Sequence, residues 1–264
     1  MINAFSKSKR VAWLGGAALG CAGGAAAWCF LPAAGAGGAR LLLAALAAFV
    51  GANIAVYIAR LFAMREYQTR LLYLYEQLDP AAFIAAVEPL TGARLDASTR
   101  CTTLAHLANG YLYAGQPQRA LQVLQSIDPP EKALEMRGLV LGNQATCYLA
   151  AGQPDKAQQC MDRLQALLAD KRCKKEFCVK ARHTLAYLQL CMQIQRGKKV
   201  DTKALEKDFA SSRAPLHRLD VQYRLALACR RSGDAQGFES ARAYVAQQGA
   251  RTALPGLLQA PGQE

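Results

Sequence analysis

Histidine is scarce in this sequence, and the patterns that accompany catalytic histidines are missing. Only three of the 264 residues are histidine, at positions 106, 183 and 217. None belongs to a recognisable Ser/His/Asp or Cys/His arrangement of the kind that nucleophilic catalysis uses. No glycine-rich phosphate loop follows an expected strand. We therefore expect no catalytic residue and no cofactor, and the chain is predicted not to be an enzyme.

Closely spaced cysteine pairs of the kind found in zinc sites are also missing. The one cluster of sulfur and imidazole ligands is Cys173, Cys178, His183 and Cys191, which helical periodicity would spread around an axis. The nine cysteines are odd in number and show no disulfide-framework spacing. Buried thiols behave as small apolar groups. This usage predicts no metal site and a reducing compartment.

Acidic residues are absent from the first part of the chain. Residues 1–63 contain no Asp or Glu, whereas residues 64–264 carry +8 of the total net charge of +13. Within the first part, residues 11–31 and 41–59 carry no charge at all. As a helix rising about 1.5 Å per residue, each run is long enough to cross a hydrocarbon layer about 30 Å thick. We expect a transmembrane hairpin over residues 1–63, with spans at about 11–31 and 41–63.

Positive charges give the orientation of this hairpin. Three basic residues precede the first run and three follow the second, whereas the connecting turn contains only Arg40. Basic flanks favour the cytoplasmic side, so both termini are expected there. Two processing alternatives stay open: the small residues at 33–36 also fit a secretory signal peptide, and residues 18–21 are faintly similar to a lipoprotein cleavage site. The apolar sequence that continues to Leu31 and the second run favour the hairpin.

Small residues recur at every fourth position in both runs. Such spacing lines one helix face with atoms that let another backbone approach closely. Contact between the two spans, contact between protomers and plain richness in alanine and glycine all remain open, and we expect the first. The helix-packing face consists of Gly16, Gly20 and Gly24 in the first run and of Ala47, Gly51 and Ala55 in the second.

The remainder of the chain has the period of amphipathic helices. Apolar residues recur at steps of three and four, as at Leu104, Leu107 and Tyr111. No stretch shows the sustained alternation with β-branched residues that a strand needs. Glycine and proline separate the helical segments. We expect an all-α domain over residues 64–250 and a C-terminal tail over residues 251–264.

One turn sequence occurs twice. AGQPQRA at residues 114–120 returns as AGQPDKA at residues 151–157, with five of seven positions identical at a spacing of 37. A glycine directly after a helix accepts the left-handed conformation, and a proline two residues later supplies a fixed φ for the next helix. Gly115 is therefore expected to end one helix and Pro117 to begin its antiparallel partner. Each copy predicts a helix hairpin.

These copies resemble the tetratricopeptide repeat family, in which large, small and aromatic residues recur over about 34 residues. The resemblance is clear over residues 100–169 and weaker over 214–248, and residues 64–89 predict a further hairpin around Asp79 and Pro80. It implies an α-solenoid of about four to five hairpins, since isolated repeats cannot bury their faces. The matching residues are Leu104, Leu107, Ala108, Tyr111, Gly115, Ala120 and Leu124, then Leu141, Ala145, Tyr148, Gly152, Ala157 and Met161.

The resemblance implies that partners bind along the concave face, where the first helix of each repeat presents its side chains. In this sequence those residues are Thr102, Ala105, Asn109, Tyr113 and Asn143. In some relatives the groove is a carboxylate clamp for an acidic peptide end. Asn109 and Asn143 fall on positions that correspond to the clamp's asparagines, whereas Ala105 replaces its lysine. Solvated or helix-terminal asparagines are the alternative.

Residues 170–182, DKRCKKEFCVKAR, are the most polarised stretch, with six basic residues against two acidic ones. Such a cluster attracts anionic lipid or acidic protein segments, or it is simply a solvated loop and helix start. No aromatic platform or motif accompanies the charge, so nucleic acid is not expected. The candidate contacts are Lys171, Arg172, Lys174 and Lys175.

Together these features predict an integral membrane protein with a scaffold or adaptor function. A repeat domain at the cytoplasmic face would bind a protein partner through its groove or through the basic stretch, with anionic lipid as a possible further contact. The alternative is a structural subunit of a membrane transport or secretion assembly, in which the hairpin itself makes the main contact. Neither the identity of the partner nor self-association follows from the sequence.

Overall fold

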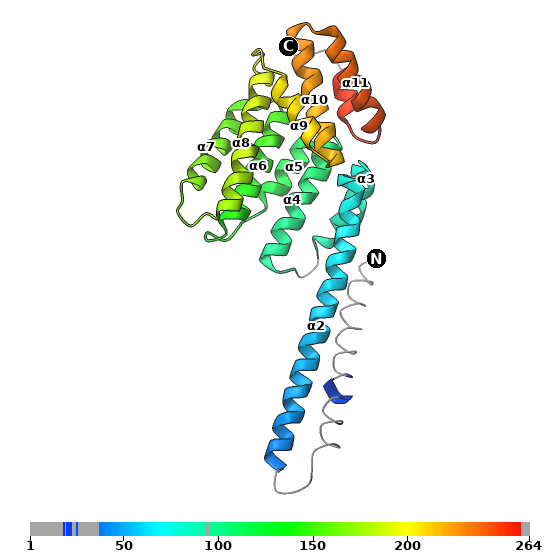
Figure 1. Cartoon of the computed structure of the whole chain (residues 1–264), viewed down its shortest axis with the longest axis vertical. Helices are drawn as coiled ribbons and strands as arrows, with labels where there is room; N and C mark the ends of the chain where they lie inside the picture. The colour runs from blue at the N-terminus through cyan, green and yellow to red at the C-terminus, as the bar shows by residue number, and fades with distance from the viewer. Residues whose placement is uncertain (1–17, 19, 23–24, 26–36, 93–94, 260–264) are drawn as a thin grey trace. The chain divides into compact units, whose positions relative to one another are not determined.

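The computed structural model describes residues 18, 20–22, 25, 37–92 and 95–259, and their regular elements are all helical (Figure 1). The all-α prediction is confirmed over these residues. The chain forms two compact units, residues 1–69 and residues 70–264. The elements are α2 (Gly37–Tyr75), α3 (Pro80–Val87), a 3-10 turn η1 (Glu88–Leu90), α4 (Ala97–Tyr113), α5 (Pro117–Gln125), α6 (Leu134–Ala150), α7 (Pro154–Leu168), α8 (Lys175–Gln195), α9 (Lys203–Ser211), α10 (Pro215–Ser232), α11 (Ala235–Gln248) and α12 (Leu254–Gln259).

The first unit exposes large apolar side chains along α2. Leu42, Phe49 and Phe62 are 73%, 67% and 64% exposed. Ala45–Tyr75 is long and apolar enough to cross a membrane, by length and composition, and it is the one such segment among the described residues. The first apolar run lies mostly outside those residues. The expected boundary at 63/64 is not a break in structure, because α2 continues through it as one helix.

Part of the expected small-residue face can be located within this unit. Gly20 is buried, and a methyl group at its α-carbon would lie 3.1 Å from the Ala48 carbonyl oxygen, so the two backbones approach closely there. Ala47 and Gly51 are half-buried. Gly16 and Gly24 lie outside the described residues, as does the side chain of Ala55.

The second unit begins with a hairpin formed by the end of α2 and by α3. The Asp79 carboxylate caps α3 by accepting a 2.9 Å hydrogen bond from the Ala82 N–H, and Pro80 follows at the first helical position. This confirms the predicted helix start. The chain leaves α2 through Leu78, which is buried and has a φ of 53°, a left-handed conformation that a leucine rarely adopts.

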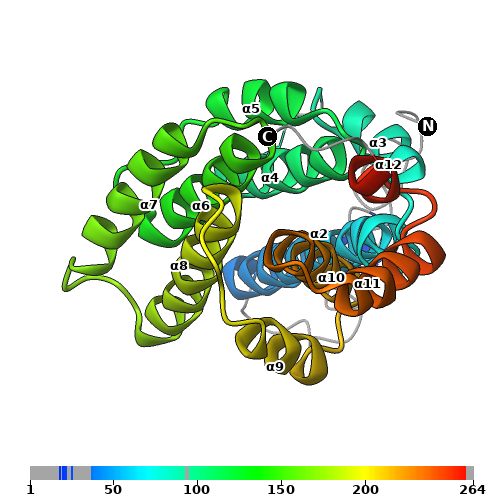
Figure 2. The same cartoon turned by 90° about the horizontal axis from the view of Figure 1, so that it is seen from above.

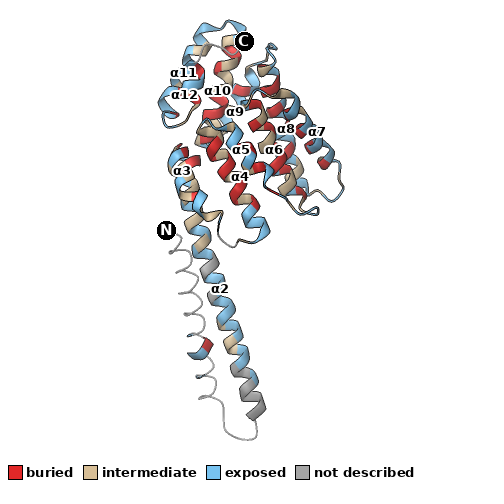
Figure 3. Ribbon diagram, turned by 180° about the vertical axis from the view of Figure 1, so that it is seen from behind, coloured by how far each residue is buried: buried red, intermediate tan, exposed pale blue. Residues whose placement is uncertain are grey.

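Four further helix pairs follow along the chain. The first helices α4, α6, α8 and α10 contact one another in sequence, and α5, α7 and α9 each contact the first helix of the next pair. Viewed from above, these pairs follow one another around a curve (Figure 2). The helix α9 packs on α10 rather than on α8, unlike the second helices of the preceding pairs. The buried residues line the facing sides of these helices (Figure 3).

The repeated turns have the backbone that their sequence predicts. Gly115 and Gly152 have φ values of 77° and 70°, and Pro117 and Pro154 open the following helices. Only glycine adopts this left-handed conformation without strain. Gly197 and Gly233 close α8 and α10 in the same conformation, with φ values of 72° and 78°. Every pair of helices from α4 to α11 thus turns at a left-handed glycine.

The C-terminal region differs from the expected tail. Leu254–Gln259 form the helix α12, in which Leu254 and Leu258 are buried. The Ala253 N–H donates a 2.9 Å hydrogen bond to the Tyr113 carbonyl, so the chain returns to the end of α4. Two leucines four residues apart form one small apolar face, which seats this helix of six residues on a neighbour.

Candidate partner-binding surfaces

The predicted inner-face residues of α4 and α6 contact other parts of the chain. The Asn109 amide donates a 3.2 Å hydrogen bond to the Tyr75 hydroxyl, and the Asn143 amide donates a 3.4 Å bond to the Ala105 carbonyl. The side chain of Ala105 is buried. The Thr102 hydroxyl donates to a carbonyl one turn earlier in its own helix. Both asparagines are therefore engaged within the domain.

Tyr75 and His106 join the end of α2 to α4. Their hydroxyl oxygen and Nδ1 lie 2.6 Å apart, and the two rings meet edge to face with centroids 5.4 Å apart. The hydroxyl accepts from Asn109, and it can donate its own proton to Nδ1 of a neutral imidazole. Burial lowers the pKa of His106, which favours the neutral imidazole that can accept this bond. The arrangement orders the inner side of the first two helix pairs.

Tyr113, at the end of α4, lies within electrostatic reach of charged groups on α10. Burial raises its pKa well above the usual value, and the Asp220 carboxylate contributes further while Arg224 opposes it. Asp220 itself accepts a hydrogen bond from the Tyr187 hydroxyl of α8 and lies 3.8 Å from the Arg224 guanidinium. Both charged side chains are nearly buried, at 10% and 13% exposure. Polar groups of α8 and α10 thus meet at a nearly buried position.

Little in the sequence indicates this polar cluster. Asp220 and Arg224 are four residues apart, a spacing that equally describes a solvated ion pair on a helix surface. Their burial depends on α8 and α10 lying side by side, which is a long-range property. That the inner-face residues contact a partner stays a prediction. Asn109 and Asn143 already make hydrogen bonds within the domain.

The second predicted surface lies at the start of α8 and is exposed. Lys171 and Arg172 belong to the loop between α7 and α8, Lys174 is the residue that precedes α8, and Lys175 is its first residue. All four side chains are exposed to solvent. The positive end of the α8 dipole lies among them, and it adds to the local positive potential. We call these four residues the basic segment.

Two cations of the basic segment already bind carboxylates of the chain. The Arg172 guanidinium lies 2.7 Å from the Asp170 carboxylate, and its hydrogen bonds lower the pKa of Asp170 to about 2. The Lys174 ammonium lies 3.0 Å from the Glu135 carboxylate of α6. Lys171 and Lys175 have no ion pair of this kind among the described residues. The basic segment therefore binds carboxylates of the chain through two of its cations, and the other two cations are available to carboxylates of a partner.

An exposed apolar residue extends this surface along α8. Val179 is 55% exposed and lies one turn after Lys175, and Arg182 lies a further turn along the same helix face. The pattern combines charge with an apolar contact, as protein interfaces do. Helical spacing of Lys175, Val179 and Arg182 was the signal in the sequence that would have identified it.

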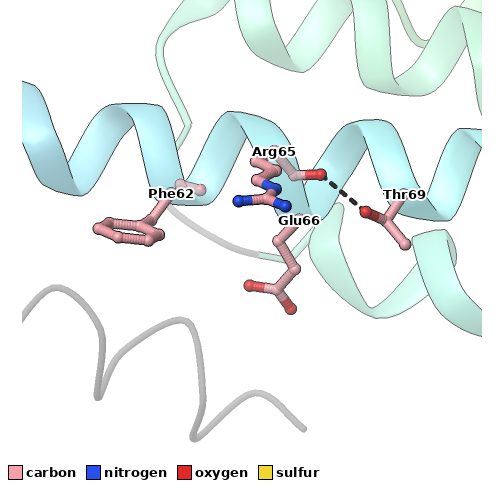
Figure 4. A pocket seen from close by; sticks show the side chains of 5 residues that line it. Phe62, Arg65, Glu66 and Thr69 are labelled. Carbon is pink, nitrogen blue, oxygen red and sulfur yellow. Dashed lines mark hydrogen bonds between the residues drawn. The ribbon is translucent and has the colours of Figure 1, made fainter.

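A hollow of about 360 Å³ lies on the first unit beside α2 (Figure 4). Phe62, Ala63, Arg65, Glu66 and Thr69 line it, and the Thr69 hydroxyl donates to the Arg65 carbonyl at 3.0 Å. All five come from one helix. The described lining thus brings no groups from different elements together around a reacting position, as catalytic sites usually do.

The cysteine and histidine side chains of residues 173–191 lie in different surroundings. Cys191 is buried in the core between α6, α7 and α8, whereas His183 is exposed. Among the described residues, no group of three or more His, Cys, Asp or Glu side chains could hold a metal ion.

Comparison with protein-family models, with curated proteins and with solved structures gives no significant match to this chain.

Proposed function

We propose that this protein is a membrane-anchored scaffold, similar to tetratricopeptide repeat proteins, whose basic segment binds an acidic segment of a protein partner at the cytoplasmic membrane face. The observation that carries the proposal is the cluster of four exposed cations at the N-terminal end of α8. Two of them pair with carboxylates of the chain itself, which stand in for those of a partner.

The arrangement of the helix pairs supports the scaffold part of the proposal. Consecutive pairs turn at left-handed glycines, and two of those turns continue into a proline at the first helical position, as in the repeat family. Stacked helix pairs offer extended surfaces and few deep clefts, which suits protein binding.

The long apolar helix supports the membrane anchor. Its exposed leucine and phenylalanine side chains would be unfavourable in water and favourable in lipid. The basic residues on both flanks of the apolar runs favour a cytoplasmic location for the domain.

A binding measurement tests the proposal on the full chain in lipid nanodiscs. The probe is a fluorescent octaglutamate peptide, and the test variant carries Lys171→Glu, Arg172→Glu, Lys174→Glu and Lys175→Glu. The matched control carries the same charge change at Lys198, Lys199, Lys203 and Lys207, which are also exposed.

The two variants give different expected results. We expect the test variant to lose at least about tenfold in peptide affinity, since each charge-assisted contact contributes roughly 0.5 kcal/mol or more at a surface. The control should lose less than threefold. Equal losses would mean that only the overall charge matters, which would contradict a specific surface. Equal binding by all three proteins would contradict it as well.

A further inference from the structure

Two cysteines of the helical domain differ from the rest in their exposure. Cys173 and Cys178 are partly exposed, and they lie within five residues of each other at the start of α8. The other described cysteines of residues 70–264 are all buried, namely Cys101, Cys147, Cys160, Cys191 and Cys229. Within the described part of this domain, the thiols that a solvent reagent can reach are therefore gathered in one place.

The helix start brings these two side chains together. Lys174 precedes α8 with an extended backbone, at φ −68° and ψ 140°, and the Cys178 N–H donates a 3.0 Å hydrogen bond to its carbonyl. Cys173 is thus the residue before the cap, and Cys178 is the fourth residue of the helix. Apolar side chains at these two positions pack against each other in the hydrophobic staple. Here both positions of the staple are thiols.

Hydrogen bonds fix Cys173 in this place. Its N–H donates to the Asp170 carbonyl at 3.0 Å, and its thiol donates to the Leu167 carbonyl at 3.2 Å. Burial raises the pKa of Cys173, and the nearby Cys178 side chain raises it further. The start of α8 thus places the two thiols at the paired positions of the staple.

We propose that Cys173 and Cys178 form a reversible intrachain disulfide when the domain meets a peroxide. One thiolate attacks a peroxide oxygen, the O–O bond breaks, and a sulfenic acid and one water result after proton transfer. The second sulfur then attacks the sulfenic sulfur, so that the S–S bond forms and the S–O bond breaks. The oxygen leaves as a second water, which carries the proton of the second thiol. The cysteine pair loses two electrons and the peroxide gains them.

The disulfide would close a short loop that contains Lys174 and Lys175. Because these are half of the basic segment, oxidation would fix the backbone that presents them. This consequence rests on the proposed function, whereas the disulfide itself does not. In a reducing compartment such a bond is transient, and dithiols reverse it by exchange.

Peptide mass spectrometry tests the disulfide on the full chain in detergent micelles. The folded protein is treated with hydrogen peroxide, alkylated with iodoacetamide and digested with trypsin. Trypsin cleaves after Lys174 and Lys175, between the two cysteines, so the disulfide leaves their two peptides covalently joined. We expect this joined peptide in more than half of the oxidised protein and its disappearance after treatment with dithiothreitol.

Variants and a denatured sample make the result decisive. Cys173→Ser and Cys178→Ser should each abolish the joined peptide, and Cys101→Ser should retain it. Circular dichroism of the oxidised protein should match that of the reduced protein, which shows that the bond forms without unfolding. A joined peptide that appears only in urea would overturn the proposal. Sulfinic acid or separate adducts on the two cysteines of the native protein would overturn it too.

Discussion

The pairs α4–α5 and α6–α7 differ from the later pairs α8–α9 and α10–α11 in the side chains that join their first helices, although all four pairs have the same kind of turn. The first two repeat the motif of small and aromatic residues, and their packing is mostly apolar, as at Ala108, Ala120 and Ala157. The last two lack much of that motif, and α8 and α10 instead share Tyr187, Asp220 and Arg224. All four turn at a left-handed glycine. The backbone turn is therefore the common requirement, and the contact between first helices can be apolar or polar.

Among the substitutions considered, one that breaks the polar contact between α8 and α10 should lower the free energy of unfolding the most. Asp220→Ala leaves the nearly buried Arg224 without its carboxylate, and we expect a loss of about 3 kcal/mol in the free energy of unfolding. Urea-dependent alkylation of the buried Cys191 and Cys229 measures this in the affected half. Adding Arg224→Met should recover part of the loss, because no uncompensated charge then remains. A loss below about 1 kcal/mol would contradict a structural role for the pair.

Alanine substitutions at Gly115 and Gly152 should have different costs, although the two turns have nearly the same sequence. A methyl group on Gly115 would meet the Ala253 side chain at 2.8 Å, whereas the one on Gly152 would meet nothing within 4 Å. Gly115→Ala should cost about 2–3 kcal/mol, from the left-handed backbone together with this clash. Thermal unfolding followed by circular dichroism measures it. Adding Ala253→Gly should reduce the cost to that of Gly152→Ala, and an unchanged cost would contradict the contact.

The open turns of the two halves should respond alike. Gly152 and Gly233 have φ values of 70° and 78°, and neither has an atom within 4 Å of an added methyl group. Gly152→Ala and Gly233→Ala should each cost about 1–2 kcal/mol, the price of a left-handed alanine. Alkylation of Cys160 reports on the first half and alkylation of Cys229 on the second. A difference above about 1 kcal/mol would show that the turns are not equivalent.

The smallest effect concerns the start of α4. The Asp96 carboxylate accepts hydrogen bonds from the Thr99 hydroxyl and N–H at 2.6 and 3.0 Å, and these bonds lower its pKa below the usual 3.8. The cap therefore stabilises the fold fully above pH 3.8 and is lost as the pH falls through the lower folded pKa. Asp96→Ala should cost about 0.5–1 kcal/mol at pH 7.

Urea unfolding of wild type and Asp96→Ala at pH 7 and at pH 2.5 measures this contribution. The difference between the two proteins should shrink at the lower pH. A difference that is equal at both values would contradict a carboxylate cap.

Local backbone chemistry was predictable from the sequence, and long-range packing was not. The turns at Gly115 and Gly152 follow from a glycine and a proline at fixed offsets, and the start of α3 follows from Asp79 and Pro80. The left-handed Leu78 was hidden because leucine carries no signal for that conformation. Likewise, Asp220 and Tyr187 are 33 residues apart in the chain and lie on different helices, so their hydrogen bond depends on how those helices pack.

The two candidate surfaces also differ in how far the sequence predicts them. The exposed basic segment could be identified from its charge, since exposure is the default for a run of cations. The inner-face positions could be assigned from the resemblance to the repeat family, but the partners of Asn109 and Asn143 within the domain could not be predicted. Whether a helix face is open or filled depends on how tightly the pairs curve, and no local pattern encodes that curvature.

The central claim is that a partner contacts the basic segment of a domain held at the cytoplasmic membrane face. Photo-crosslinking in intact cells tests it most directly, with a photoreactive amino acid in place of Val179 in the full chain. The account predicts a crosslinked partner that survives protease added outside the cells and disappears when the four cations are reversed to Glu. The matched control at Lys198, Lys199, Lys203 and Lys207 should retain it. A crosslink that persists in the charge-reversed protein, or a domain that external protease removes, would contradict the account.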